Sequence, residues 1–206
     1  MRQLFLFLFF QSAFFANAQD ATFPKKHFQF FAGTSYNGTG DISGFAFKSE
    51  FGLYFKKKSS FQINMGGTIH DKVHEIFYTD QSGKTVDGSV RATIAGFQIA
   101  GLYGYSFVRT QKDEFLIKVG PVVRYQSSSY WDQLGEYSPI ITGVPFPVVD
   151  FINLSPQRTF AIGGNLALAY NYTISNKVSI GILGEFQTDS NGDTISQLLF
   201  SVGTRF

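Results

Sequence analysis

Apolar residues alternate with small or polar residues in eight separate segments of this 206-residue chain. A period of two is typical of β-strands, because successive side chains point to opposite faces of a sheet. The pattern is clearest in residues 45–55, where Phe47 and Phe51 share one face and Lys48 lies on the other. The other segments span 27–36, 61–66, 97–107, 115–125, 160–170, 178–187 and 198–206. The chain is therefore predicted to be all-β.

The connections between these segments alternate in length. Those after the second, fourth and sixth segments are brief, whereas those after the third and fifth, residues 71–89 and 126–158, are long and polar or proline-containing. Outer-membrane barrels have this arrangement, with short turns in the periplasm and longer loops outside. An even number of strands also leaves both ends of the chain on one side.

The apolar faces are about ten residues long with aromatic residues near their ends, which suits a thin hydrocarbon layer with interfacial aromatic girdles. Beyond residue 18 there is no apolar run of the ~18 residues that a transmembrane helix needs. A closed barrel is the remaining way to satisfy backbone groups in lipid. We predict one domain, residues 19–206, forming a closed antiparallel up-and-down transmembrane β-barrel of eight strands.

Two other architectures fit part of the pattern. The 126–158 connection could add two strands to make a ten-stranded barrel, although its prolines oppose regular pairing. A soluble lipocalin-like barrel would turn the apolar faces inward and leave the charged faces in water.

The first 18 residues have the features of a secretory signal peptide. Arg2 supplies a positive charge, residues 4–10 form a short apolar stretch, and Ala16-Asn17-Ala18 is a small-x-small cleavage site. We expect cleavage after Ala18. The chain contains no cysteine, so neither a disulfide nor a lipid-anchored cysteine is expected.

Charged and amide side chains occupy the faces opposite the apolar ones. An eight-stranded barrel is just wide enough to be filled by such side chains, and a buried charge needs a partner. We therefore predict an interior polar network of Lys48, Glu50, Gln62, Asn64, Gln98, Lys118, Arg124, Asn165 and Glu185. A proton or ion path through these residues is the functional alternative. No metal site or cofactor is expected.

The last seven residues alternate and end on an aromatic residue, with Phe200, Val202, Thr204 and Phe206 on one face. This ending and the strand pattern resemble the small eight-stranded outer-membrane barrels of the OmpA and OmpX type. The resemblance implies that these four residues form the signal read by the barrel-assembly machinery, although Thr204 is less apolar than the pattern prefers. It also implies a bacterial outer membrane, with lipid and lipopolysaccharide as surroundings.

Pro121 falls inside the fifth segment, where a proline removes a hydrogen bond from the strand ladder. The structural interpretation is a local bulge, and the functional one is a lateral seam that lets small apolar molecules pass toward lipid. Lipid-modifying enzymes on similar barrels use His with Ser and a carboxylate. Here His27, His70 and His74 are present, but no motif singles one out.

The 126–158 connection holds four of the six prolines and an unusual number of apolar residues. Its apolar residues could form a hairpin that projects beyond the membrane, cap the barrel mouth or contact an extracellular partner. The candidates for contact are Tyr130, Trp131, Ile140, Ile141, Phe146 and Phe151, although Tyr130 and Trp131 fit anchoring at the membrane interface better. The near balance of charges does not suggest nucleic-acid binding. The predicted function is a structural or surface-binding role, with a narrow channel or lateral transporter second and an enzyme third.

Overall fold

The computed structural model describes residues 23–38, 42–79, 82–137, 139–154, 156–175 and 177–206, so the predicted signal peptide lies outside the described residues. Eight long strands account for most of them: β1 (Lys26–Asn37), β2 (Ile42–Tyr54), β3 (Ser59–His74), β6 (Val90–Arg109), β7 (Asp113–Ser128), β10 (Arg158–Thr173), β11 (Val178–Asp189) and β12 (Thr194–Arg205). Each coincides with one of the alternating segments.

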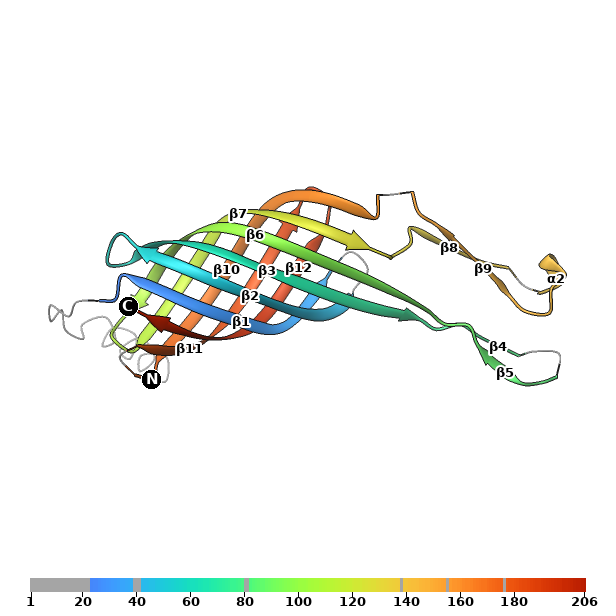
Figure 1. The fold of residues 1–206 in the computed structure, drawn as a ribbon, viewed down its shortest axis with the longest axis horizontal. Coiled ribbons are helices and arrows are strands. Elements are labelled where there is room, and N and C mark those ends of the chain that lie inside the picture. Colours follow the sequence, from blue (N-terminus) through green and yellow to red (C-terminus); the bar gives the residue numbers. More distant parts are fainter. Residues whose placement is uncertain (1–22, 39–41, 80–81, 138, 155, 176) are drawn as a thin grey trace, which may run out of the picture.

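These strands form a closed antiparallel barrel in the order β1-β12-β11-β10-β7-β6-β3-β2 (Figure 1). Pairing of the first and last strands, from His27–Arg205 to Asn37–Ile195, closes it. The predicted fold class is confirmed. The ten-stranded alternative is wrong, because β8 (Gln133–Tyr137) and β9 (Val148–Ile152) pair only with each other, outside the barrel.

The two ends of the barrel differ. Tight turns join β2 to β3, β6 to β7 and β10 to β11 at the end where the carboxyl terminus lies, here called the turn end (Figure 1). At the opposite, loop end, two arms extend from the barrel. The first arm is the hairpin of β4 (Phe77–Thr79) and β5 (Thr85–Asp87), and the second comprises β8, the single-turn helix α2 (Pro139–Thr142) and β9.

Burial alternates along every barrel strand. The outward positions carry large apolar side chains that are about half exposed or more, such as Ile63, Val119 and Phe200. Inward positions such as Leu102, Leu183 and Leu199 are fully buried. An apolar outer face and a buried polar interior are what a barrel in lipid requires, and they exclude the lipocalin-like arrangement. Among the described residues, no helix is both long and apolar enough to span a bilayer.

Some strands run further than the alternation predicts. β3 continues to His74 and β6 starts at Val90, so part of the polar 71–89 connection is paired strand. In this extension Asp71 accepts hydrogen bonds from Thr93 Oγ1 at 2.5 Å and Arg91 Nη2 at 2.8 Å. These bonds lower the pKa of the Asp71 carboxyl. Polar cross-strand pairs stabilise a ladder without an apolar face, so apolar alternation could not detect it.

The outward face predicts a depth-dependent penalty for charge. Val119 lies midway along β7 and is half exposed, so Val119→Arg should lower the free energy of unfolding by about 2–4 kcal/mol in vesicles. Val73, equally exposed near the loop end of β3, is the matched control, and Val73→Arg should cost about 0–1 kcal/mol. Urea unfolding measures both. Equal costs at the two positions would contradict the placement of the bilayer.

Candidate functional sites in the lumen and at the loop end

An ion-pair layer crosses the middle of the lumen. Lys118 Nζ lies 2.5 Å from Glu50 Oε1, and Lys48 pairs with Glu185. His27 Nε2 lies 3.4 Å from the same oxygen of Glu50. β7 and β2 are separated by two other strands around the barrel, as are β2 and β11. Each pair therefore links opposite parts of the wall rather than neighbouring strands.

Phe31 packs inside this layer. It is the inward-pointing exception to the alternation of its segment, and it is almost fully buried. Its ring centre lies 5.4 Å from the ammonium of Lys118 and 5.8 Å from that of Lys48. Its other neighbours in a buried apolar cluster include Leu116 and Leu183. The aromatic ring thus joins apolar packing to cation–π contact with both lysines.

A second layer closes the turn end around Glu114. This buried carboxylate accepts hydrogen bonds from Arg205 Nη2 at 2.9 Å, Tyr54 Oη at 2.5 Å and Ser106 Oγ at 2.8 Å. The guanidinium of Arg109 lies 3.4 Å from the centre of the Tyr54 ring. This layer was not among the predicted network residues. The alternation could have predicted it, because Glu114 lies four residues before Lys118 on the same strand and therefore faces the lumen as Lys118 does.

A third layer lies toward the loop end around Arg124. Its Nη1 is 3.6 Å from Asp193 Oδ2 and 3.7 Å from Asp189 Oδ2, so two carboxylates share one guanidinium. Gly96 leaves the space for it, because a Cβ there would lie 2.5 Å from Arg124 Nε. Asp189 and Asp193 lie between the alternating segments 178–187 and 198–206, so the alternation did not assign them to the lumen.

The structure places all nine predicted network residues inside the lumen, each at most 5% exposed. It joins Lys48, Glu50, Lys118 and Glu185 in one layer and puts Arg124 in another. The amide side chains of the network make fewer hydrogen bonds than its charged side chains. Gln62 donates to Ser60 Oγ at 2.6 Å, but neither side-chain polar atom of Asn64 or of Asn165 has a hydrogen-bond partner among the described residues.

The histidines occupy three different settings. His70 is buried in the lumen, with Nε2 2.9 Å from Ser35 Oγ. Within the described residues, no carboxylate forms an ion pair with His70, so the Ser–His contact lacks a third member. His27 belongs to the middle layer, and His74 is exposed on the first arm's base. The three histidines are not brought together.

Pro121 faces outward between two glycines, Gly101 on β6 and Gly164 on β10. The β10–β7 pairing is continuous there and includes Gly164–Pro121. The β6–β7 pairing runs to Ala100–Val122 and resumes at Tyr103–Val119 with unchanged register. Pro121 therefore interrupts one ladder without a bulge, and the register shift between these strands lies instead at Ser106–Val108.

The carboxy-terminal residues lie on the outer surface of β12 and beyond it. Phe200, Val202 and Phe206 are more than half exposed, and Thr204 pairs with Phe28 of β1. The apolar edge they form is thus on the lipid side of the closing strand pair. Its role as an assembly signal stays a prediction.

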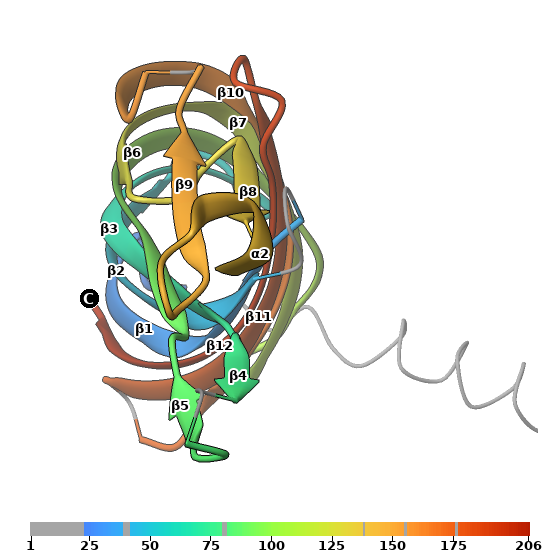
Figure 2. The same ribbon diagram turned by 90° about the vertical axis from the view of Figure 1, so that its right-hand side faces the viewer.

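The second arm ends in an apolar tip, residues 137–149, which contain no charged side chain. Pro139 begins α2, and Gly143, with φ 71°, ends it by donating its backbone N–H to the Pro139 carbonyl at 2.8 Å. The turn leaves Ile140 and Ile141 95% and 75% exposed, and Phe146 is half exposed. Figure 2, which views the molecule from the loop end, shows α2 and β9 in front of the barrel.

Aromatic contacts stiffen the base of this arm. Tyr130 and Trp131 stack with ring centres 5.3 Å apart, and Trp131 also packs against Phe151 at 5.2 Å. His74, from the end of β3, contacts Trp131 at 6.1 Å and lies 3.3 Å from Glu136. The two arms are therefore joined at their bases. Of the predicted contact residues, Tyr130, Trp131 and Phe151 belong to this base, whereas Ile140, Ile141 and Phe146 belong to the tip.

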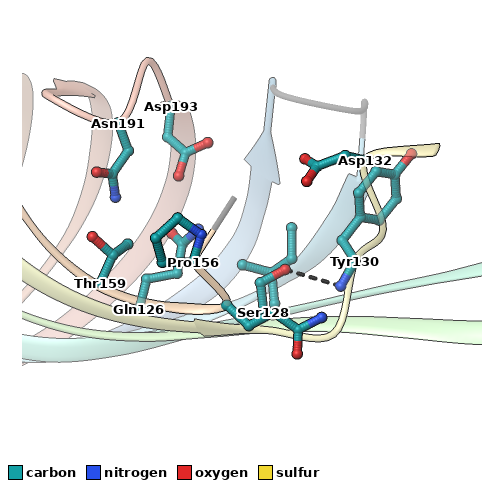
Figure 3. A pocket seen from close by; sticks show the side chains of 10 residues that line it. Gln126, Ser128, Tyr130, Asp132, Pro156, Thr159, Asn191 and Asp193 are labelled. Atoms are coloured by element: carbon teal, nitrogen blue, oxygen red, sulfur yellow. Dashed lines mark hydrogen bonds between the residues drawn. The ribbon is translucent and has the colours of Figure 1, made fainter. Parts of the chain in front are cut away.

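A cavity of about 320 Å³, lined mainly by residues with polar side chains, opens at the loop end of the barrel beside the base of the second arm (Figure 3). Asp132 and Asp193 lie on opposite sides of it. Its lining comprises Ile94, Gln126, Ser128, Tyr130, Asp132, Pro156, Gln157, Thr159, Asn191 and Asp193. The alternation of the sequence does not predict this cavity, because its lining residues come from four separate parts of the chain.

Fold, outer surface and lumen together define a small eight-stranded antiparallel β-barrel with an apolar outer face, the architecture of small transmembrane barrels. Three solved structures share the fold. Neisserial surface protein A matches with a TM-score of 0.58 at 10% identity, over 88% of this chain and 97% of the other. Ail of Yersinia pestis, in complex with the heparin analogue sucrose octasulfate, matches with 0.54 at 10%, over 90% and 100%. The amino-terminal barrel domain of Pseudomonas aeruginosa OprF matches with 0.50 at 11%, over 89% and 99%.

No family model and no curated protein sequence matches the chain. At these identities the structural matches establish the fold alone. Within the described residues, no group of three or more His, Asp or Glu side chains is arranged to hold a metal ion.

The middle layer predicts a strong dependence of stability on charge pairing. Lys118→Met leaves Glu50 buried with only the more distant His27 beside it, and should lower the free energy of unfolding by about 3–5 kcal/mol. Adding Glu50→Gln should recover most of this loss, because the uncompensated charge disappears. Lys112→Met, in an exposed turn, is the control and should have little effect. Urea unfolding in detergent is the measurement, and a Lys118→Met barrel as stable as the parent would contradict the pairing.

Proposed function

We propose that this chain is a non-catalytic surface-binding protein of the bacterial outer membrane, which uses its second arm for attachment to a partner outside the cell. The barrel fixes the arm in the membrane, and the arm makes the contact. Residues 1–18 would direct export, and the edge formed by Phe200, Val202, Thr204 and Phe206 would be read by the barrel-assembly machinery. Outer-membrane lipid and lipopolysaccharide would surround the barrel.

The exposure of the charge-free tip is the observation that carries this proposal. Two adjacent isoleucines, Ile140 and Ile141, each expose at least three quarters of their surface at the far end of an arm. Isolated exposed apolar residues are common, but a contiguous apolar patch usually marks an interaction surface. The lipid-facing belt has a separate explanation in the bilayer, whereas the tip extends beyond it.

The fold comparisons are compatible with this role. Ail is described as an attachment invasion locus protein and was crystallised with a heparin analogue, and Neisserial surface protein A bears a name that places it at the cell surface. Their low identity to this chain transfers no partner. The support comes from the architecture, in which a barrel of this size carries recognition in its loops.

Passage of a small apolar molecule through the wall at Pro121 is the second candidate. The interrupted β6–β7 pairing favours it, because two consecutive residue pairs are missing where Gly101 and Gly120 approach closely. The lumen argues against it, since Leu102 and Val122, which neighbour this gap, are fully buried in an apolar cluster. An ion path and a lipid-modifying enzyme rank below it.

Attachment should depend on the tip. Bacteria that display the protein should adhere to cultured epithelial cells, and Ile140→Ser with Ile141→Ser should reduce the number attached by about tenfold, because both side chains lose apolar contact area. Deletion of residues 138–152 should abolish the gain in attachment over cells without the protein. Leu154→Ser is the matched control, because Leu154 is 74% exposed but lies outside the tip.

Surface amounts of all variants are compared by antibody labelling. Equal attachment of the Ile140→Ser, Ile141→Ser variant and the parent at equal surface amounts would overturn the proposal.

A further inference from the structure

We propose that the cavity at the mouth of the barrel is a binding site for an amine-bearing sugar. The inference goes beyond attachment by the arm, because residues 138–152 contribute nothing to the lining of the cavity. It rests on the size of the cavity, the chemistry of its walls and the incomplete pairing of its buried carboxylate.

The size suits a small polar ligand. About 320 Å³ is at the lower end of the range for ligand-binding sites, which begins near 300 Å³, and is adequate for one or two sugar units. Part of the cavity wall is formed by paired barrel strands. Gln126 and Ser128 lie on β7, Thr159 on β10 and Ile94 on β6, all within paired regions of the barrel strands.

The walls combine the groups that bind sugar hydroxyls. Side-chain amides of Gln126, Gln157 and Asn191 and hydroxyls of Ser128 and Thr159 supply both donors and acceptors. Gln126 Oε1 is buried and has no hydrogen-bond partner among the described residues. A buried acceptor of this kind is costly unless a ligand or water pairs with it.

Tyr130 adds an aromatic surface to one wall. Its ring is fixed by stacking against Trp131 with an angle of only 5° between the planes. Such a ring can pack against the apolar face of a sugar or against an ammonium group. The chain contains no other tryptophan, so Trp131 is also a natural reporter for binding.

Charge selects an amine rather than an anion. The lining contains Asp132 and Asp193 but no lysine or arginine. Arg124 lies below Asp193 but is shared with Asp189 at 3.6–3.7 Å, too far for a hydrogen bond. These three aspartates and one arginine leave a formal charge of −2, counted as one minus three.

Asp193 is the strongest single indication of a ligand. It is only 6% exposed, it lines the cavity, and its Oδ2 has no hydrogen-bond partner among the described residues. Asp132 faces it across the cavity and already accepts the backbone N–H of Leu154 at 2.6 Å through Oδ2. An ammonium group between them would supply the cation that Arg124 provides only in part.

The test is a titration of the purified, refolded barrel with chitobiose, the β1→4 dimer of glucosamine, followed by Trp131 fluorescence. Saturable binding is expected. Asp193→Asn and Asp132→Asn should each weaken it about tenfold or more, because each removes a charge-assisted hydrogen bond. Asp150→Asn, an exposed carboxylate on β9 outside the cavity, is the control and should bind like the parent.

Two further probes separate the parts of the proposal. N,N′-diacetylchitobiose, which has the same rings without the charge, should bind about tenfold more weakly, and spermidine, which has amines without a ring, should also bind more weakly. Tyr130→Leu should weaken the binding of both sugars, because it removes the aromatic surface while the carboxylate of Asp193 remains. Resistance of the folded band to detergent during electrophoresis confirms that each variant is a barrel.

Absence of saturable binding by chitobiose, or unchanged affinity in both aspartate variants, would overturn the proposal. If spermidine binds as tightly as chitobiose, the site does not recognise a sugar, and the proposal is overturned. If a sulfated sugar binds more tightly than chitobiose, the site does not select an amine, and the proposal is also overturned. If the tip variants lose attachment but still bind chitobiose, attachment by the arm and sugar binding in the cavity are independent of each other.

Discussion

Closure of the backbone ladder between β1 and β12 is the constraint on which the rest of this structure depends. A strand in hydrocarbon has no water to satisfy its N–H and C=O groups, so the sheet must have no free edge. The eleven paired positions from His27–Arg205 to Asn37–Ile195 remove that edge. Once the sheet is closed, the period of two places every strand residue either toward lipid or toward the lumen. Because the outward face is apolar, the polar and charged side chains of the strands must lie in the lumen.

The lumen meets this demand by pairing charges across the barrel. Lys118–Glu50, Arg205–Glu114 and Lys48–Glu185 each connect strands that are separated by two others, so their geometry depends on the completed barrel. Leaving one partner alone in such a setting is costly, so each charge depends on the presence of its partner. The resulting interior is a cross-linked support. Recognition can then be placed on the arms and at the mouth of the barrel.

The fold was predictable because alternation and closure both act on short stretches of sequence or on simple counts. Phase alone predicted that the nine network residues face inward. Glu114 and Arg205 carried the same signal, but Glu114 lies one residue outside its alternating segment and Arg205 lies inside the carboxy-terminal pattern, so neither was included in the predicted network. The partners themselves were not predictable, since Arg124 meets Asp189 and Asp193 only through the barrel's curvature and the space left by Gly96. The cavity was beyond prediction for the same reason, because Asp132 and Asp193 are 61 positions apart, 193 minus 132.

The central claim is that the lumen supports the surface and does not conduct. Single-channel recording of the protein refolded in a planar bilayer tests it most directly, with Lys118→Ala, Glu185→Ala and deletion of residues 138–152 recorded alongside. The account predicts no steady conductance from the parent or from the deletion variant, because three layers of buried side chains cross the lumen whether or not the arm is present. A stable conductance in the parent that shifts with the charges at Lys118 and Glu185 would contradict it and make the lumen a pore.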